Sequence, residues 1–426
     1  MRQTKGLRWW IIGLIAVATV INYIDRTSLA VMWPDISTDL DLTKDQYATI
    51  VSAFMIAYAV GQAVSGKFFD WVGTRFGFIV SISVWSLACM LHGLARGAMS
   101  FSLVRALLGV SEAGNWPGAT KSNAEWHPIK ERALAQGIFN AGASLGAVIS
   151  APLVAFLYLY LGWKATFIVI GSLGMLWIIP WWIVNRAPPG EHPWISPEER
   201  EFILTGQRVA EAPNGETRVP SWGELLTYKQ SWAVIVSRFF LDPIWWLFVN
   251  WLPIYLAEQF GFDVKEIGLF AWVPYCGAAI GSVLGGWWSG HMIGKGWTAD
   301  KARKRAIVFG GILMVPSFIA AAYAGSPTVA VLVMAVVLGG FQVAINNIQT
   351  LPSDLFSGKS VGSLAGLGGA SAVLGVLVFS TWLIPVLSEV SYVPVFLMGA
   401  ALVPLGIGSV FVFGGTIKHI ELRREK

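Results

Sequence analysis

The sequence predicts an all-α membrane protein of about twelve transmembrane helices, divided into two groups of six by a polar segment. Three observations support this fold class. Of the 426 residues, 55% are hydrophobic and only 13% are charged, whereas soluble chains average about a quarter charged. Apolar runs long enough to cross a bilayer recur along the whole chain. The longest polar stretch between them lies near the middle.

A spanning helix needs about 20 predominantly apolar residues, and twelve segments meet that requirement. The first six cover residues 9–32, 47–66, 76–94, 101–119, 133–158 and 165–184. The second six cover residues 232–256, 267–291, 306–324, 329–350, 362–387 and 393–415. We therefore expect a first six-helix bundle at 1–185, a cytoplasmic linker at 186–230 and a second six-helix bundle at 231–426.

The linker contains two helix-start signals. The letters SPEE at 196–199 and SWGE at 221–224 each place Glu three residues after Ser, which is the pattern of a capping box. We expect a short surface helix after each. The segment is too short to build a core of its own, so we interpret it as a tether between the bundles rather than as a separate domain.

The basic residues predict the orientation. Most of the 30 Lys and Arg residues fall in loops on the side of the two termini, and the loops of the other side hold Lys44, Arg96, Lys164 and Lys265. Cytoplasmic loops are enriched in basic residues, so we expect both termini in the cytoplasm. The net charge of +5 then reflects membrane topology and gives no reason to expect a nucleic-acid partner. We see no cleavable signal peptide before the first span.

The loop after the second span carries a recognisable motif. It reads GKFFDWVGTR at 66–75 and resembles the Gly-x-x-x-Asp-x-x-Gly-x-Arg signature of the major facilitator superfamily. We expect Gly66 to allow close helix approach, Gly73 to allow a tight turn, and Asp70 to cap or pair with a neighbouring element as an inner gate. Arg75 completes the signature. The resemblance implies two six-helix bundles related by pseudo-twofold symmetry about the membrane normal, the arrangement known for this superfamily.

A closer resemblance covers nearly the whole chain. The segments that carry it include KGLRWW at 5–10, NYIDR at 22–26, EAGNWP at 112–117, GIFNAG at 137–142 and RFFLDPIWW at 238–246. Together they are similar to bacterial hexuronate transporters of the anion:cation symporter group. That group also holds galactonate, glucarate and tartrate carriers. The resemblance implies import of a sugar acid together with protons.

Ionisable residues within spans are functional candidates, because each is unfavourable there unless paired or hydrated. Asp25 and Arg26 lie late in the first span, and Arg105 and Glu112 lie seven residues apart in the fourth. A guanidinium binds both oxygens of a carboxylate, so we expect Arg26 first, and Arg105 second, to bind the substrate. Positions matching Asp25 and Glu112 carry the coupling protons in galactonate-type relatives. We expect Arg105 to hold Glu112 ionised when no substrate is bound, with all of these groups sharing one chamber.

Structural readings of these charges remain open. Arg105 and Glu112 can form an ion pair that only stabilises the helix, and Asp25 with Arg26 can lie in the outer headgroup zone. Arg238 and Asp242 are four residues apart near the start of the seventh span, and we interpret them as a structural clamp. We expect His92 at the outer surface, without a role in proton transfer.

Sugar hydroxyls require hydrogen-bonding groups and aromatic faces at membrane depth. Polar and aromatic side chains of this kind occur in several spans. The candidates for substrate contact beside the two arginines are Tyr23, Tyr58, Asn140, Ser144, Trp245, Asn250, Gln342 and Asn346.

These features predict a monomeric symporter of the bacterial inner membrane that imports a sugar acid anion with protons by alternating access. The substrate we expect is a hexuronate, galacturonate or glucuronate. The alternatives are an aldonate or aldarate such as galactonate or glucarate, another organic anion, or anion exchange without protons. We expect no enzyme activity, because no nucleophile–His pair or metal-ligand spacing is present, and we expect no cofactor or metal.

Overall fold

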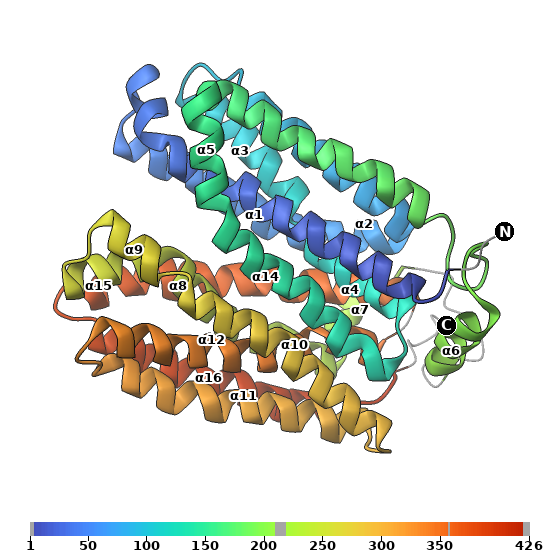
Figure 1. The fold of residues 1–426 in the computed structure, drawn as a ribbon. Helices are drawn as coiled ribbons and strands as arrows, with labels where there is room; N and C mark the ends of the chain where they lie inside the picture. The colour runs from blue at the N-terminus through green and yellow to red at the C-terminus, as the bar shows by residue number, and fades with distance from the viewer. Residues whose placement is uncertain (1–3, 209–218, 357, 421–426) are drawn as a thin grey trace.

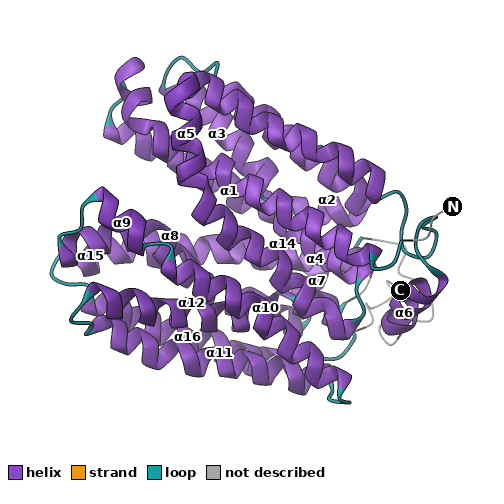
Figure 2. Ribbon diagram, in the orientation of Figure 1, coloured by secondary structure: helices purple, strands orange, loops and turns teal. Residues whose placement is uncertain are grey.

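The computed structural model describes residues 4–208, 219–356 and 358–420. The described residues form helices joined by loops and turns (Figure 2). The helices of the first half are α1 (Leu7–Asp39), α2 (Lys44–His92), α3 (Ala98–Glu112), α4 (Asn115–Trp126) and α5 (Ile129–Val184). The linker forms α6 (Pro197–Arg208) and α7 (Trp222–Thr227).

The second half contains shorter segments in addition to its long helices. Its helices are α8 (Lys229–Phe260), α9 (Val264–Phe270), α10 (Val273–Gly294), α11 (Ala299–Ala322), α12 (Pro327–Gln349), α13 (Leu351–Leu355), α14 (Val361–Val376), α15 (Ile384–Ser388) and α16 (Val393–Gly414). A 3-10 turn at Gly358–Ser360 precedes α14, and a π-helical segment at Leu377–Leu383 joins α14 to α15.

The helix lengths agree with twelve membrane crossings. Eight helical segments among the described residues are long and apolar enough to cross a membrane. Two of them, α2 with 49 residues and α5 with 56, are each about twice the length that one crossing needs. Each turns at a glycine with left-handed backbone angles, Gly73 (φ 80°) and Gly162 (φ 70°). With α3–α4 and α10 as the remaining crossings, the predicted all-α fold class is confirmed.

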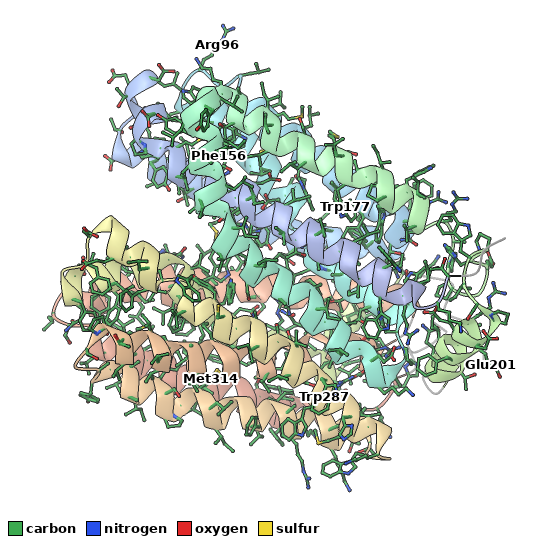
Figure 3. The ribbon with its side chains drawn as sticks, viewed as in Figure 1. Arg96, Phe156, Trp177, Glu201, Trp287 and Met314 are labelled. Carbon is green, nitrogen blue, oxygen red and sulfur yellow. The ribbon has the colours of Figure 1, made fainter. Side chains whose placement is uncertain are left out.

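Apolar side chains pack into two cores, one for each half of the chain. One core is built almost entirely from buried residues of α1 to α6, including Trp177, and the other from residues of α7 to α16, including Met314. Figure 1 shows the corresponding two layers of helices, and Figure 3 labels both side chains within their layers. The two halves are therefore separately packed units, and the interface between them is here called the seam.

The seam depends on glycines that let the two layers approach. A side chain at Gly66 of α2 would overlap the backbone of Gly362 in α14, and a side chain at Gly286 of α10 would overlap the backbone of Ala133 in α5. These contacts lie at the end of the molecule that carries α6, here called the α6 end. Toward the opposite end, which carries α9, the ribbons of the two layers diverge (Figure 1).

The first linker helix, α6, packs on the first layer, whereas α7 packs against α8 of the second. Both short helices begin at the expected serines: Ser196 accepts a hydrogen bond from the amide of Glu199, and Ser221 accepts one from the amide of Glu224. In a complete capping box the Glu199 carboxylate would accept a hydrogen bond from the amide of Ser196, but here it binds a different helix. It accepts hydrogen bonds from the amides of Gly6 (2.8 Å), Leu7 (3.1 Å) and Arg8 (3.3 Å) at the start of α1. The α6 helix is therefore fixed to the first layer.

Candidate functional site

A central pocket lies between the two layers. It is lined by side chains from α1, α2, α4 and α5 on one wall and from α8, α12 and α14 on the other. The polar lining residues are Tyr23, Arg26, Tyr58, Gln62, Asn140, Arg238, Asp242, Gln342 and Gln349, and the aromatic ones are Trp116, Trp245, Trp246 and Phe341. A pocket with this mixture of charges, amides and rings can hold a polar, anionic small molecule.

Arg26 is the cation of the first wall. Its guanidinium donates to Oε2 of Glu112 from Nη2 (3.1 Å) and Nε (3.3 Å), and to the side-chain oxygen of Asn22 (3.2 Å). Four aromatic rings surround it, with centroids 4.8–5.5 Å from Cζ: those of Tyr23, Phe54, Tyr58 and Trp246. The rings and the carboxylate hold the guanidinium in one place against the pocket.

Glu112 lies behind Arg26 and not in the pocket wall. Its side chain is 0% exposed, and its Oε1 atom has no hydrogen-bond partner among the described residues. We expected Arg105 to be the cation that holds Glu112, and this is wrong. Arg105 donates instead to the backbone carbonyl of Arg26 at 2.6 Å and does not line the pocket. The direct partner of Glu112 is Arg26.

Asp25 faces away from Arg26 although the two are neighbours in sequence. Successive residues of an α-helix point about 100° apart, and of this pair only Arg26 lines the pocket. Asp25 is completely buried, and neither of its carboxylate oxygens has a hydrogen-bond partner among the described residues. The expected single chamber for Asp25, Arg26 and Glu112 is therefore wrong in detail, because only Arg26 reaches the pocket.

His92 also departs from its expected position. It is fully buried, with Nδ1 2.8 Å from the carbonyl oxygen of Ala88 and its ring stacked on Phe167 at 4.9 Å. We expected it at the outer surface. Although α2 ends at His92, the fourth and sixth spans cover that face of the helix through Phe101 and Phe167.

The Arg238–Asp242 pair lies in the second wall. Nη2 and Nε of Arg238 donate to Oδ2 of Asp242 at 2.7 and 2.9 Å. We interpreted the pair as a structural clamp, and the ion pair on α8 is present. Both residues also line the pocket, so a role in ligand contact is open to them as well. Because α8 begins at Lys229, Arg238 lies about nine residues, or roughly 14 Å, along the helix.

Amides form a network beneath the pocket. Asn140 of α5 donates to Asn346 (2.6 Å) and Gln349 (2.7 Å) of α12, and Gln136 also donates to Gln349 (2.8 Å). Asn346 in turn donates to the backbone of Ser282 at 2.9 Å. Asn140 and Gln349 line the pocket, whereas Asn346 supports them from outside it.

Most of the remaining candidates line the pocket, and two do not. Tyr23, Tyr58, Trp245 and Gln342 are in the wall, and Tyr23 accepts a hydrogen bond from Nε1 of Trp245 across the two layers at 2.9 Å. Ser144 is buried outside the wall, and Asn250 is exposed one turn beyond Trp246. Sequence reasoning missed Gln62, Trp116 and Gln349. Spacing could have found two of them, since Gln62 follows Tyr58 by one turn and Gln349 follows Gln342 by two.

Asp70 of the signature motif joins the layers at the α6 end. Its Oδ1 accepts hydrogen bonds from the amide of Gly362 (3.0 Å) and from Nζ of Lys121 (3.1 Å), and its Oδ2 accepts one from the amide of Ser363 (2.6 Å). These amides begin α14, where a carboxylate is favoured by the helix dipole. Arg75 lies apart from this group and donates to the carbonyl of Arg186 at 2.7 Å.

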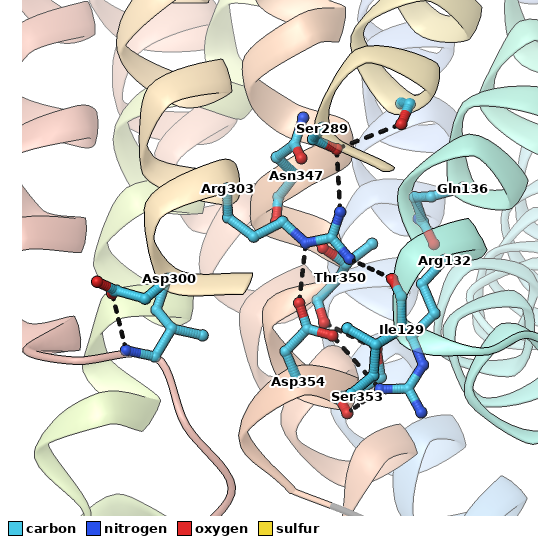
Figure 4. Close-up of polar contacts among 12 residues, drawn as sticks. Ile129, Arg132, Gln136, Ser289, Asp300, Arg303, Asn347, Thr350, Ser353 and Asp354 are labelled. Atoms are coloured by element: carbon cyan, nitrogen blue, oxygen red, sulfur yellow. Dashed lines mark hydrogen bonds and ion pairs between the residues drawn. The ribbon is translucent and has the colours of Figure 1, made fainter. Parts of the chain in front are cut away.

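A second polar cluster joins the layers nearby (Figure 4). Asp354 accepts from Arg303 of α11 at 2.9 Å and from Arg132 of α5 at 3.4 Å. Arg132 also donates to the carbonyl of Ser353 (2.6 Å), and Arg303 to the carbonyl of Ile129 (2.9 Å). Arginines from both halves thus share one carboxylate. The stretch of the second half that corresponds to the signature motif, at 285–291, contains no acid, and this cluster supplies one from α13.

Comparison with known proteins gives concordant results. The family model described as "Major Facilitator Superfamily" matches residues 15–296. A hexuronate transporter of Escherichia coli (strain K12) is 32% identical over 435 residues, covering 100% of this chain and 98% of that protein. A galacturonate transporter of Dickeya chrysanthemi is 32% identical over 317 residues, covering 74% of this chain and 91% of that protein. A probable galactarate/D-glucarate transporter of Escherichia coli (strain K12) is 30% identical, with coverage of 99% and 98%.

Solved structures resemble this fold at low sequence identity. The human organic anion transporter MFSD10 has a TM-score of 0.69 at 15% identity, covering 96% of this chain and 100% of that one. The proton:xylose symporter XylE has a TM-score of 0.70 at 15% identity, covering 96% of both chains. At such identities the resemblance concerns the fold alone.

Proposed function

The chain belongs to the major facilitator superfamily, and we propose that it imports a sugar acid anion with protons by alternating access. It is a multi-pass membrane transporter and not an enzyme. The substrate we propose is a hexuronate such as galacturonate or glucuronate. The named relatives that cover the full chain at about one-third identity transport hexuronates or are assigned to galactarate and glucarate.

The observation that carries this proposal is the Arg26–Glu112 pair at the central pocket. Arg26 faces the pocket, and Glu112 is buried behind it at 3.1 Å. A substrate carboxylate and Glu112 compete for one guanidinium. When Glu112 is protonated its hold on Arg26 weakens, and Arg26 can bind the substrate carboxylate through its fork. Binding of a proton and binding of the anion are thereby favoured together.

Proton coupling also answers an energetic requirement. An inside-negative membrane opposes entry of an anion by about 2.3 kcal/mol per charge per 100 mV. One accompanying proton removes this opposition for a monoanion, and a second makes the potential a driving force. Asp25 supports a second site, because a fully buried carboxylate with no ion pair among the described residues is strongly unfavourable when charged and is relieved by a proton.

The two layers provide the moving parts of the cycle. We propose that the bundles at 1–185 and 231–426 rock against each other, with 186–230 as the cytoplasmic linker. The α6 end would face the cytoplasm of a bacterium, as the basic loops indicate. The Asp70 group and the Asp354 cluster would then close the inner side, and the pocket would open toward the α9 end. Release of these contacts would expose the pocket to the cytoplasm.

The test is uptake by the purified protein in proteoliposomes. We expect saturable uptake of labelled galacturonate that rises with an inward proton gradient and is unchanged by sodium. Absence of uptake for galacturonate, glucuronate, galactonate and glucarate alike would refute the sugar-acid assignment. Uptake that responds to a sodium gradient but not to a proton gradient would refute the proton assignment.

The Glu112→Gln variant tests the coupling separately. The amide keeps the size of the side chain but cannot exchange a proton, so we expect exchange of substrate to continue while accumulation driven by pH is lost. Glu201→Gln, which changes an exposed acid on α6, serves as a control that keeps accumulation. Accumulation by Glu112→Gln at the wild-type level would remove Glu112 from the coupling mechanism.

A further inference from the structure

The two walls of the pocket present different charges to a ligand. The guanidinium of Arg26 is the charged group of the first wall that lines the pocket. Its partner Glu112 is 0% exposed and lies behind it. On the second wall both Arg238 and Asp242 line the pocket, and the Asp242 side chain is 10% exposed. A bound molecule therefore meets a cation on the first wall and a cation–anion couple on the second.

One carboxylate oxygen of Asp242 is available to accept a hydrogen bond from a ligand. Both hydrogen bonds from Arg238 end on Oδ2, and no donor among the described residues reaches Oδ1. Arg238 also retains donor capacity, since its Nη1 makes only a 3.5 Å contact with the carbonyl of Ala365. A carboxylate oxygen accepts well from a hydroxyl, and a guanidinium N–H donates well to one. Side by side, they suit a polyol and offer no net positive charge.

We propose that the Arg238–Asp242 couple is the specificity determinant for the part of the substrate that contacts the second wall. It accepts hydroxyl groups and rejects a second carboxylate that reaches the second wall, so that the carrier selects monoanionic uronates over dianionic aldarates. This inference rests on the proposed function and adds a substrate class to it. The rejected group meets the Asp242 anion, and like-charge placement against a competing ligand is an established route to specificity.

The geometry distinguishes this role from a purely structural pair. A pair that only stabilises α8 has no need to face the pocket with both members. Here Trp245 and Trp246 follow Asp242 on the same wall, and they supply ring faces for the apolar side of a sugar. Hydrogen-bonding charges next to aromatic rings on the second wall therefore face the carboxylate-binding Arg26 on the first.

The test compares competition by galactarate and by galacturonate for galacturonate uptake in proteoliposomes. For the wild type we expect galactarate to compete at least about tenfold less well, because its second carboxylate meets the Asp242 anion. In Asp242→Asn the added charge loses its opponent and the adjacent Arg238 becomes unpaired. The ratio of the two inhibition constants should then fall by about tenfold or more, a change of about 1.4 kcal/mol.

Three comparisons complete the design. Asp242→Glu, which keeps the charge, should preserve the preference for the uronate. Glu389→Gln removes one exposed acid outside the pocket and should leave the ratio unchanged. In the wild type, the monomethyl ester of galactarate should compete at least about tenfold better than the diacid, and this measurement needs no variant to fold.

The outcomes separate the inference from the proposed function. If the wild type transports no sugar acid, the proposed function is wrong and the inference falls with it. If galacturonate is transported but galactarate competes equally well, or the ratio is the same in Asp242→Asn, the inference alone is wrong. A falling ratio in Asp242→Asn together with rescue by the monomethyl ester supports it.

Discussion

At the scale of single residues, the site contains buried charges, and each one is stable only because of the groups that pair with it. Arg26 is held by Glu112, by Asn22 and by four aromatic rings. Breaking a buried ion pair from one side leaves the other charge uncompensated, which destabilises by about 3–5 kcal/mol. Transport can therefore be lost through destabilisation of the fold or through loss of the substrate-binding group. A double variant that removes both charges separates these two causes.

Arg26→Ala should abolish uptake and also lower the midpoint of thermal unfolding, because Glu112 is left charged and buried. The double variant Arg26→Ala with Glu112→Gln removes that charge. It should recover most of the unfolding midpoint but no uptake, since the carboxylate-binding group is still missing. Thermal unfolding in detergent and uptake in proteoliposomes measure the two effects. Uptake by the double variant at wild-type affinity would show that Arg26 does not bind the substrate.

His127 gives a prediction for pH. It lies between α4 and α5 outside the spans, is fully buried, and has no hydrogen-bond partner for either ring nitrogen among the described residues. Burial, with smaller contributions from Arg8 and Arg132, lowers its pKa to about 3. The folded protein thus disfavours the protonated ring, which forms in the unfolded chain below a pKa of about 6.5.

Stability from this group is complete above about pH 6.5 and decreases as the pH falls toward 3, by up to about 1.4 kcal/mol per pH unit. His127→Phe keeps an aromatic ring against Trp9, whose centroid lies 5.1 Å from that of His127, and cannot be protonated. The decrease in unfolding midpoint between pH 7 and pH 5 should therefore be smaller in His127→Phe than in the wild type. Equal decreases in the two proteins would contradict the prediction.

At the scale of elements, the linker helix α6 functions as a cap for α1. Glu199 accepts from three amides at the start of α1 and from Nη1 of Arg8 (2.7 Å), and Nε of Arg8 donates to Glu131 of α5 (2.7 Å). A carboxylate at a helix N-terminus is favoured by unpaired amides and by the helix dipole. The contacts tie α6, α1 and α5 into one rigid unit.

Glu199→Gln should lower the free energy of unfolding by about 1.5–3 kcal/mol, the range for hydrogen bonds to a charged group. The KM for the substrate should not change, because Glu199 lies far from the pocket lining. Glu201→Gln is the matched control, since Glu201 is exposed on the same helix, as Figure 3 shows. If both variants unfold at the same temperature as the wild type, the cap contributes little to stability.

At the scale of the whole molecule, two polar clusters hold the layers together at one end. Asp70 joins α2 to the start of α14, and Asp354 joins Arg132 of the first half to Arg303 of the second. The layers diverge toward the opposite end (Figure 1). A change in either cluster should therefore shift the equilibrium between the two conformations of the carrier rather than unfold one bundle.

Asp70→Asn should weaken closure at the α6 end, because an amide loses the ion pair with Lys121 and holds the start of α14 less firmly. Spin labels at positions 201 and 301, one in each half, should show a longer distance population in the variant than in the wild type. The unfolding midpoint of the variant should change little by comparison. An unchanged distance distribution would mean that Asp70 does not hold the closed state.

The sequence predicted the spans well because apolar length and helix length are directly linked. It also predicted the turn at Gly73 and the helix starts at Ser196 and Ser221, where local chemistry decides. It could not predict which charge faces the pocket. Asp25 and Arg26 are adjacent, and only the packing of α1 decides between them. It also could not show that Arg238 and Asp242 line the pocket, because their spacing places them on one face of a helix but does not say which helices pack around that face.

The glycines at the seam have a practical consequence. At Gly66 and Gly286 the backbones of opposite bundles touch with no side chain between them, so separating the bundles at these two points requires no side chain there to repack. A bulky residue introduced at Gly66 or Gly286 would overlap the opposite bundle and prevent the two bundles from closing at the α6 end. It would leave each half intact while capturing the carrier in its opposite state, in a form suited to crystallisation or to raising conformation-specific antibodies.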